Sequence, residues 1–237
     1  MPLPDDIGPL DWIAFASVAL GWLSYNLLID GSRWLPRNLN AHMRQVRRFW
    51  MRRMLERDNR MFDASLVGVS VQAIAFFAST TALSLVALLG MLGAIENVRT
   101  LSNRLSFTIP TSAGLLAMKL LVLVAVLVYA FFKFTWALRQ YSYACALIGA
   151  APMPSAPRYR LAVYADHCAD MLTFAVTSFN AGSRAYYFGL AVVAWIFHPI
   201  ACIAATAFVL AILANRQFNS PTFRAVIADL EELERKS

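Results

Sequence analysis

The segment RWLPRNLNAHMRQVRRFWMRRMLERDNR, residues 33–60, holds nine arginines and no lysine. It follows one long apolar run and precedes another. Arg and Lys collect in the short loops that stay in the cytoplasm, so this segment predicts both a membrane and a direction across it. We expect the arginine-rich loop on the cytoplasmic side of a bacterial inner membrane.

Outward from this loop, four apolar runs each have the length that a helix needs to cross a hydrocarbon core of about 30 Å. They cover residues 12–29, 64–93, 113–138 and 185–213. Of the 237 residues, 59% are hydrophobic and 15% are charged, whereas an average soluble domain has about 25% charged residues. The sequence therefore predicts a single all-α domain, an integral membrane four-helix bundle with amphipathic helices on its cytoplasmic side.

Four crossings would place both chain ends outside, with residues 214–237 as a periplasmic tail. The stretch before residue 12 carries three aspartates and no Lys or Arg, so it lacks the positive region of a secretory signal and is easily translocated. Residues 30–63 and 139–184 are then cytoplasmic. The sequence leaves open whether residues 158–184 lie wholly in the cytoplasm or partly in the membrane.

Residues 39–62 combine an apolar stripe and an arginine stripe at helical spacing, which is typical of a basic helix lying in the membrane interface. One interpretation is an anchor that holds the bundle at the right depth. The other is a docking site for anionic lipid, a nucleotide or an acidic partner. The residues expected to bind lipid are Arg44, Arg47, Arg48, Trp50 and Arg52. The net charge of +7 is concentrated in segments tethered to the membrane, so we expect lipids as partners and no nucleic acid.

The predicted fourth span contains His198-Pro199 near its midpoint. An ionisable group near the bilayer centre is costly and usually faces a bundle interior or a wet cavity, and Pro199 is expected to bend the helix. Small residues around His198 favour close packing against another helix or a symmetry copy, which predicts a homo-oligomer. The competing interpretation is a neutral imidazole that hydrogen-bonds between helices.

A second candidate site is expected where the third span and the following polar stripe meet on the cytoplasmic side. It consists of Arg139, Gln140, Asp166, Asp170, Asn180 and Arg184. Its arginines would hold a small anion through paired hydrogen bonds, or the same residues would form a buried ion-pair network. Lys119 in the third span is a further candidate, and the alternative is that its long side chain reaches the headgroups.

Nothing in the sequence predicts catalysis. It contains no nucleotide-binding glycine pattern and no Ser or Cys paired with His in a recognisable motif. Asp166, His167 and Asp170 lack a further ligand, so no metal site is predicted, and the three cysteines follow no metal or disulfide spacing. We expect neither an enzyme nor a cofactor. Two functions remain: a channel or transporter for ions or small anions, and a non-transporting structural protein that binds anionic lipid or partner proteins.

Residues 133–141, KFTWALRQY, and residues 178–188, SFNAGSRAYYF, resemble two recurrent segments of one protein family. It is the domain-of-unknown-function family number 599, which comprises multi-pass membrane proteins of bacteria and plants. The similarity extends over roughly residues 10–215. The resemblance implies the multi-helix membrane fold and draws attention to Arg139, Asn180 and Arg184, and it implies no activity.

Overall fold

The computed structural model describes residues 6–27, 39–104, 108–155, 157–218 and 220–236. Every regular element within these ranges is a helix, which confirms the all-α prediction. The helices are α1 (Pro9–Tyr25), α2 (Leu39–Leu55), α3 (Met61–Gly93), α4 (Ile95–Asn103), α5 (Ala113–Gly149), α6 (Arg158–Phe197), α7 (Pro199–Phe218) and α8 (Pro221–Lys236). Residues 28–38, where the first predicted span ends and the arginine-rich segment begins, lie outside the described residues.

The boundaries of these helices follow from local sequence. Helix α5 ends at Gly149, just before three prolines that cannot continue a helix. Helix α6 then runs for 40 residues without a break, through Gly182. Helix α2 is shorter than the predicted helix over 39–62 and ends at Leu55. The next helix starts at Met61, whose backbone N–H donates to the Asn59 side chain.

The helices form two compact units. Unit 1 comprises Met1–Arg33, Ser79–Phe131 and Gly182–Leu213, and unit 2 comprises Trp34–Ala78, Phe132–Ala181 and Ala214–Ser237. Helices α3, α5, α6 and α7 each contribute one part to each unit. Unit 1 has five basic and five acidic residues, whereas unit 2 has 16 basic and nine acidic ones, so the whole net charge of +7 belongs to unit 2.

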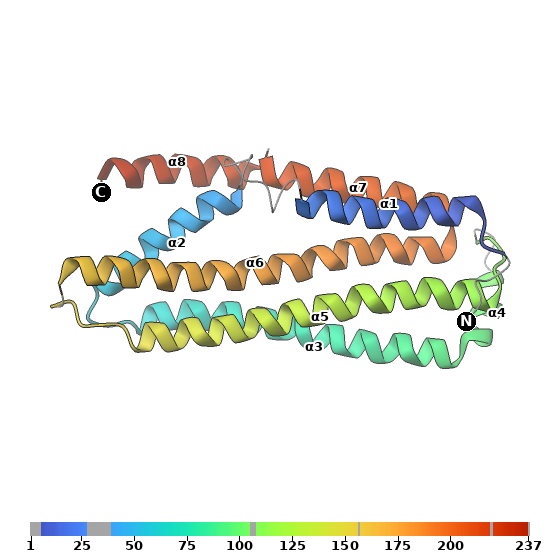
Figure 1. Ribbon diagram of the computed structural model, residues 1–237, viewed down its shortest axis with the longest axis horizontal. Coiled ribbons are helices and arrows are strands. Elements are labelled where there is room, and N and C mark those ends of the chain that lie inside the picture. The colour runs from blue at the N-terminus through green and yellow to red at the C-terminus, as the bar shows by residue number, and fades with distance from the viewer. Residues whose placement is uncertain (1–5, 28–38, 105–107, 156, 219, 237) are drawn as a thin grey trace. The chain divides into compact units, whose positions relative to one another are not determined.

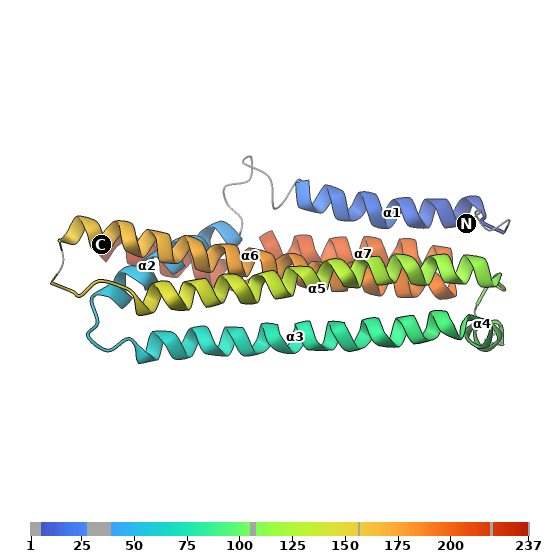
Figure 2. The ribbon, with the colours of Figure 1, turned by 60° about the horizontal axis from the view of Figure 1, so that its bottom comes forward.

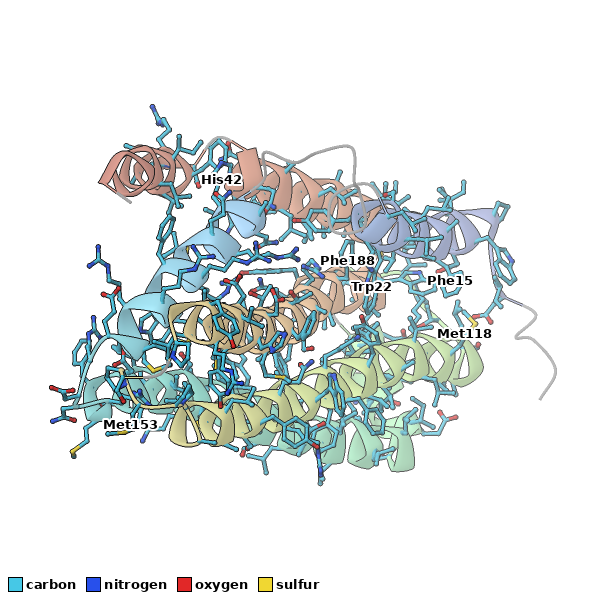
Figure 3. All side chains as sticks on the ribbon, turned by 60° about the vertical axis from the view of Figure 1, so that its left-hand side comes forward. Phe15, Trp22, His42, Met118, Met153 and Phe188 are labelled. Atoms are coloured by element: carbon cyan, nitrogen blue, oxygen red, sulfur yellow. The ribbon has the colours of Figure 1, made fainter. Side chains whose placement is uncertain are left out.

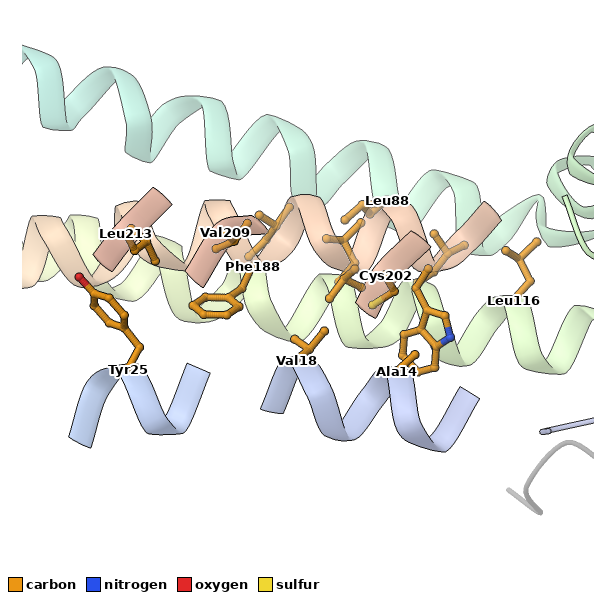
Figure 4. Packing of buried hydrophobic residues seen from close by; sticks show 14 residues of the cluster. Ala14, Val18, Tyr25, Leu88, Leu116, Phe188, Cys202, Val209 and Leu213 are labelled. Carbon is orange, nitrogen blue, oxygen red and sulfur yellow. The ribbon is translucent and has the colours of Figure 1, made fainter. Parts of the chain in front are cut away.

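Unit 1 is organised around an apolar core. Along α1, the side chains of Ala14, Val18 and Tyr25 point toward the core residues of α6 and α7 (Figure 4). The Trp22 ring stacks on the Phe188 ring, with centroids 5.5 Å apart and planes 4° from parallel (Figure 3). This close packing depends on the small residues of α1, which let the neighbouring helices approach.

Helices α6 and α7 are antiparallel, because the chain reverses at His198 (Figure 1). Gly21 shows this directly, since a Cβ added there would lie 3.6 Å from a Phe188 ring carbon and 3.2 Å from a Thr206 methyl carbon. In one continuous helix, those two residues would be about 27 Å apart. Helix α1 lies beside α7 in unit 1 (Figure 2). The predicted single span over residues 185–213 is therefore wrong. The physical reason is Pro199, which cannot extend α6 but suits the first turn of a new helix.

In unit 2, the C-terminal helix α8 packs against the arginine-rich helix α2. The His42 and Phe223 rings meet edge to face, with centroids 5.6 Å apart and planes at 87°. Two helices in direct contact lie on the same side of a membrane. The α2–α8 contact therefore favours one side for both segments, whereas the sequence predicted a periplasmic tail over residues 214–237 opposite a cytoplasmic arginine-rich loop.

Three helical segments in the described part of the chain are long and apolar enough to cross a membrane. They are Met61–Gly93, Ala113–Gly149 and Pro199–Gln217. The structure thus supports membrane-spanning helices, and the predicted four-helix bundle with amphipathic helices is not confirmed.

Candidate functional site

His198 occupies the reversal between α6 and α7 and is half-buried. Its Nδ1 atom accepts a hydrogen bond from the Ile200 backbone N–H at 3.1 Å, which satisfies one of the free donors at the start of α7. The carbonyl of Phe197 accepts from the Ile109 backbone N–H at 3.3 Å. The expectation of a histidine at the midpoint of a span is wrong, because His198 caps a helix end.

The predicted cytoplasmic cluster is divided between the two units. Arg184 belongs to unit 1, where it is 7% exposed and its guanidinium carbon lies 5.6 Å from the centroid of the Tyr25 ring. The other five members belong to unit 2. There the Ser178 hydroxyl lies 2.6 Å from the Gln140 side-chain amide, and Arg139 is exposed.

The two aspartates of that cluster pair with arginines of α2. Asp170 lies 3.6 Å from Arg48, and Asp166 lies 3.2 Å from Arg52. These pairs are partly exposed, so each contributes on the order of 1 kcal/mol or less. The charges of these two aspartates therefore tie α2 to α6, and the predicted anion site of the cluster stays a prediction.

Two further contacts show that α2 and α6 run antiparallel in unit 2. The Asn180 side-chain amide donates to Asn40 at 3.5 Å, and Arg47 Nε donates to the Thr173 hydroxyl at 2.9 Å. Moving from Asn40 to Arg47 along α2 corresponds to moving from Asn180 back to Thr173 along α6, so the two helices run in opposite directions. Much of the stripe predicted to face lipid thus faces protein, since Arg47, Arg48 and Arg52 all contact α6.

Asp63 in the first turn of α3 holds the end of α2. Its side chain is fully buried, and its Oδ1 accepts from Trp50 Nε1 and from Arg57, both at 2.7 Å. Trp50, predicted to bind lipid, is thereby engaged inside unit 2. The sequence reasoning passed over Asp63, although an acidic residue in the first turn of a helix is a recognisable signal.

Unit 1 contains a buried ion pair. Lys119 is 2% exposed, and its Nζ lies 3.2 Å from Asp11 Oδ1. The same oxygen accepts from Trp195 Nε1 at 2.8 Å, and Lys119 Nζ lies 5.6 Å from the centroid of the Trp195 ring. Because its ammonium is buried in this ion pair, Lys119 does not extend to the lipid headgroups. The interpretation that it does is wrong. The sequence analysis read Asp11 only as part of an acidic terminus and missed Trp195.

An open apolar groove of about 530 Å³ lies between α1 and α7 of unit 1. The hydroxyls of Ser17, Ser24 and Thr206 line it, and each donates to a carbonyl of its own helix. Because these hydroxyls already have hydrogen-bond partners within their own helices, the groove presents an apolar surface. The predicted homo-oligomer stays a prediction.

The membrane-capable helices, the neutral unit with its buried ion pair and the strongly basic second unit define a helical membrane protein. The sequence model of the family described as "Protein of unknown function, DUF599" matches residues 13–222. The chain belongs to this family, which confirms the resemblance seen at residues 133–141 and 178–188. Searches of the curated proteins and of the solved structures found no match.

Proposed function

We propose that this protein crosses the bacterial inner membrane five times, through α1, α3, α5, α6 and α7. The reversal at His198 adds one crossing to the four that were predicted. The N-terminus is then outside, and the C-terminal helix lies in the cytoplasm together with α2. The net charge supports this orientation, because all of it belongs to unit 2 and positively charged segments stay in the cytoplasm.

We further propose that unit 2 binds anionic phospholipids of the cytoplasmic leaflet and that the protein does not transport a solute. A stripe on α5 carries this proposal. Phe132, Trp136, Arg139 and Tyr143 follow one another at spacings of four, three and four, and all four side chains are exposed. Aromatic rings favour the level of the headgroups, and an arginine there attracts anionic lipid.

Lipid retention tests this function. The purified protein would be placed in bilayers that mix phosphatidylglycerol with phosphatidylcholine, and the lipid that stays bound would be quantified by native mass spectrometry. Arg139→Gln should lower the preference for phosphatidylglycerol about fivefold, since one basic side chain near an anionic surface contributes about 1 kcal/mol. Arg104→Gln is the matched control, because Arg104 is an exposed arginine of unit 1. Equal effects of the two substitutions would refute the proposal.

One observation favours transport of an ion or small anion as a second candidate function. Ionisable side chains buried within membrane segments often mark ion or proton pathways, and Lys119 and Asp11 form such a pair in unit 1. Liposomes containing the protein should then show an ion or proton flux that Lys119→Met abolishes. If liposomes with the unmodified protein show no more flux than empty liposomes, this candidate function is refuted.

A further inference from the structure

The charges along the α2–α6 interface are balanced in one half and unbalanced in the other. In the balanced half, Arg48 and Arg52 each face an aspartate of α6. In the other half, residues 39–47 of α2 and 173–181 of α6 contain no Asp or Glu at all. Arg44 and Arg47 lie in this half, and neither forms an ion pair with a carboxylate among the residues that the structure describes.

Arg47 is the more unusual of the two, because its side chain is only 8% exposed. Its Nε donates to the Thr173 hydroxyl, and that hydroxyl donates in turn to the Ala169 carbonyl at 2.7 Å. The hydrogen-bond partner of the guanidinium is therefore a neutral hydroxyl, and the proton of that hydroxyl is already donated to a carbonyl. A buried charge without a counterion is strongly unfavourable. Burial lowers the pKa of Arg47, Tyr141 raises it in part, and the positive charge of Arg44 lowers it.

Polar contacts lie at both ends of this half of the interface. The Asn40–Asn180 contact lies at one end and the Arg47–Thr173 contact lies at the other. Seven residues of helix, or about 10 Å, separate these contacts along α2. Arg44 follows Asn40 by four residues and precedes Arg47 by three, so it lies on the same side of α2. Arg44 lies between the two contacts along α2 and is exposed to solvent.

We propose that this half of the interface is a binding site for a phosphate-type anion, held by the guanidiniums of Arg47 and Arg44 and by the side-chain amides of Asn40 and Asn180. The planar guanidinium donates paired hydrogen bonds that match phosphate oxygens. The anion supplies the negative charge that Arg47 lacks. Its source is either free phosphate or the phosphodiester of a phospholipid headgroup. The headgroup form rests on the proposed function, and the free-anion form does not.

The test uses the full-length protein in bilayer nanodiscs and follows its thermal unfolding. In the first arm, phosphatidylcholine discs receive inorganic phosphate, with chloride at equal ionic strength as the reference. In the second arm, phosphatidylglycerol replaces phosphatidylcholine and no phosphate is added. Phosphate or phosphatidylglycerol should raise the unfolding temperature, because a ligand that binds only the folded state stabilises it.

Arg47→Gln should weaken the apparent affinity at least tenfold, and Arg44→Gln should weaken it in the same direction. Arg53→Gln is the control, because Arg53 is an exposed arginine of α2 that pairs with Glu56. In phosphatidylcholine without phosphate, Arg47→Gln should unfold at or above the temperature of the unmodified protein, since it removes an uncompensated buried charge. A merely structural arginine would show the opposite.

The outcomes separate the sources and the two proposals. A shift with phosphate in phosphatidylcholine identifies a free-anion site, and a shift with phosphatidylglycerol alone identifies a headgroup site. No shift in either arm, or equal shifts in Arg47→Gln and the unmodified protein, would overturn the proposed site. A phosphatidylglycerol response that survives Arg47→Gln but disappears in Arg139→Gln would support the lipid-binding function and refute the anion site at Arg47.

Discussion

Replacing Asp11 by Asn should destabilise unit 1 more than any other single change of its charge. In the native protein, Asp11 Oδ1 accepts from both Lys119 and Trp195. An asparagine oxygen can keep the indole hydrogen bond, but it carries no charge. The substitution would therefore leave the Lys119 ammonium, which is 2% exposed, without a counterion.

The size of the effect follows from this burial. Removing one partner of a buried ion pair costs about 3–5 kcal/mol, and the near absence of solvent means that little of this is screened. The ammonium keeps its position near the Trp195 ring, and a cation–π interaction contributes about 1–2 kcal/mol. We therefore expect Asp11→Asn to cost about 3 kcal/mol.

Lys119→Met should cost less, about 2 kcal/mol, because Asp11 keeps the Trp195 hydrogen bond and lies in the first turn of α1, where the helix dipole favours a carboxylate. The double variant should recover most of the loss, since it removes both charges. A double-mutant cycle on the free energy of unfolding in detergent micelles measures the coupling. If Asp11→Asn costs less than about 1 kcal/mol, the pair behaves like a surface salt bridge and the reasoning is refuted.

Three further predictions concern single positions. The Ser112 hydroxyl donates to Asp6 and lowers the pKa of that carboxyl. The stabilisation of the folded state by this hydrogen bond is full above the ordinary pKa of 3.8 and is lost as the pH falls through the lowered pKa. Asp6→Asn should remove this acid dependence of thermal unfolding. Gly21→Leu should cost about 1–3 kcal/mol by overpacking unit 1, whereas Gly68→Leu, with open space around its Cα, should cost nothing measurable in the same assay. Cys168 is fully buried, so maleimide should label its thiol at neutral pH only after unfolding, as peptide mapping would show; prompt labelling of the folded protein would contradict this.

Sequence reasoning was most successful where one local signal determined the structure. The long apolar runs over residues 64–93 and 113–138 predicted two helices, and the structure contains both as α3 and α5. The region from 185 to 213 misled the prediction. Its residues are apolar whether they form one span or the facing ends of two antiparallel helices, so hydropathy alone does not separate the two arrangements. The proline that was expected to bend one helix instead begins another.

The side-chain partners were less predictable than the helices. Lys119 was recognised as a candidate, but its partners Asp11 and Trp195 are 108 and 76 residues away in the sequence, and periodicity reports only neighbours on one helix. The arginine stripe of α2 was also recognised, and its assignment to lipid overlooked the aspartates of α6. The pairing of Arg48 with Asp170 depends on how two helices are aligned in space, which their sequences do not show separately.

The proposed cytoplasmic position of α2, α8 and the anion site depends on the orientation of the C-terminal helix. Fusion of a fluorescent protein and of alkaline phosphatase to the C-terminus measures it directly, since the first is fluorescent only inside the cell and the second is active only outside. A cytoplasmic C-terminus predicts a fluorescent fusion and an inactive phosphatase. An active phosphatase together with a dark fluorescent fusion would contradict it.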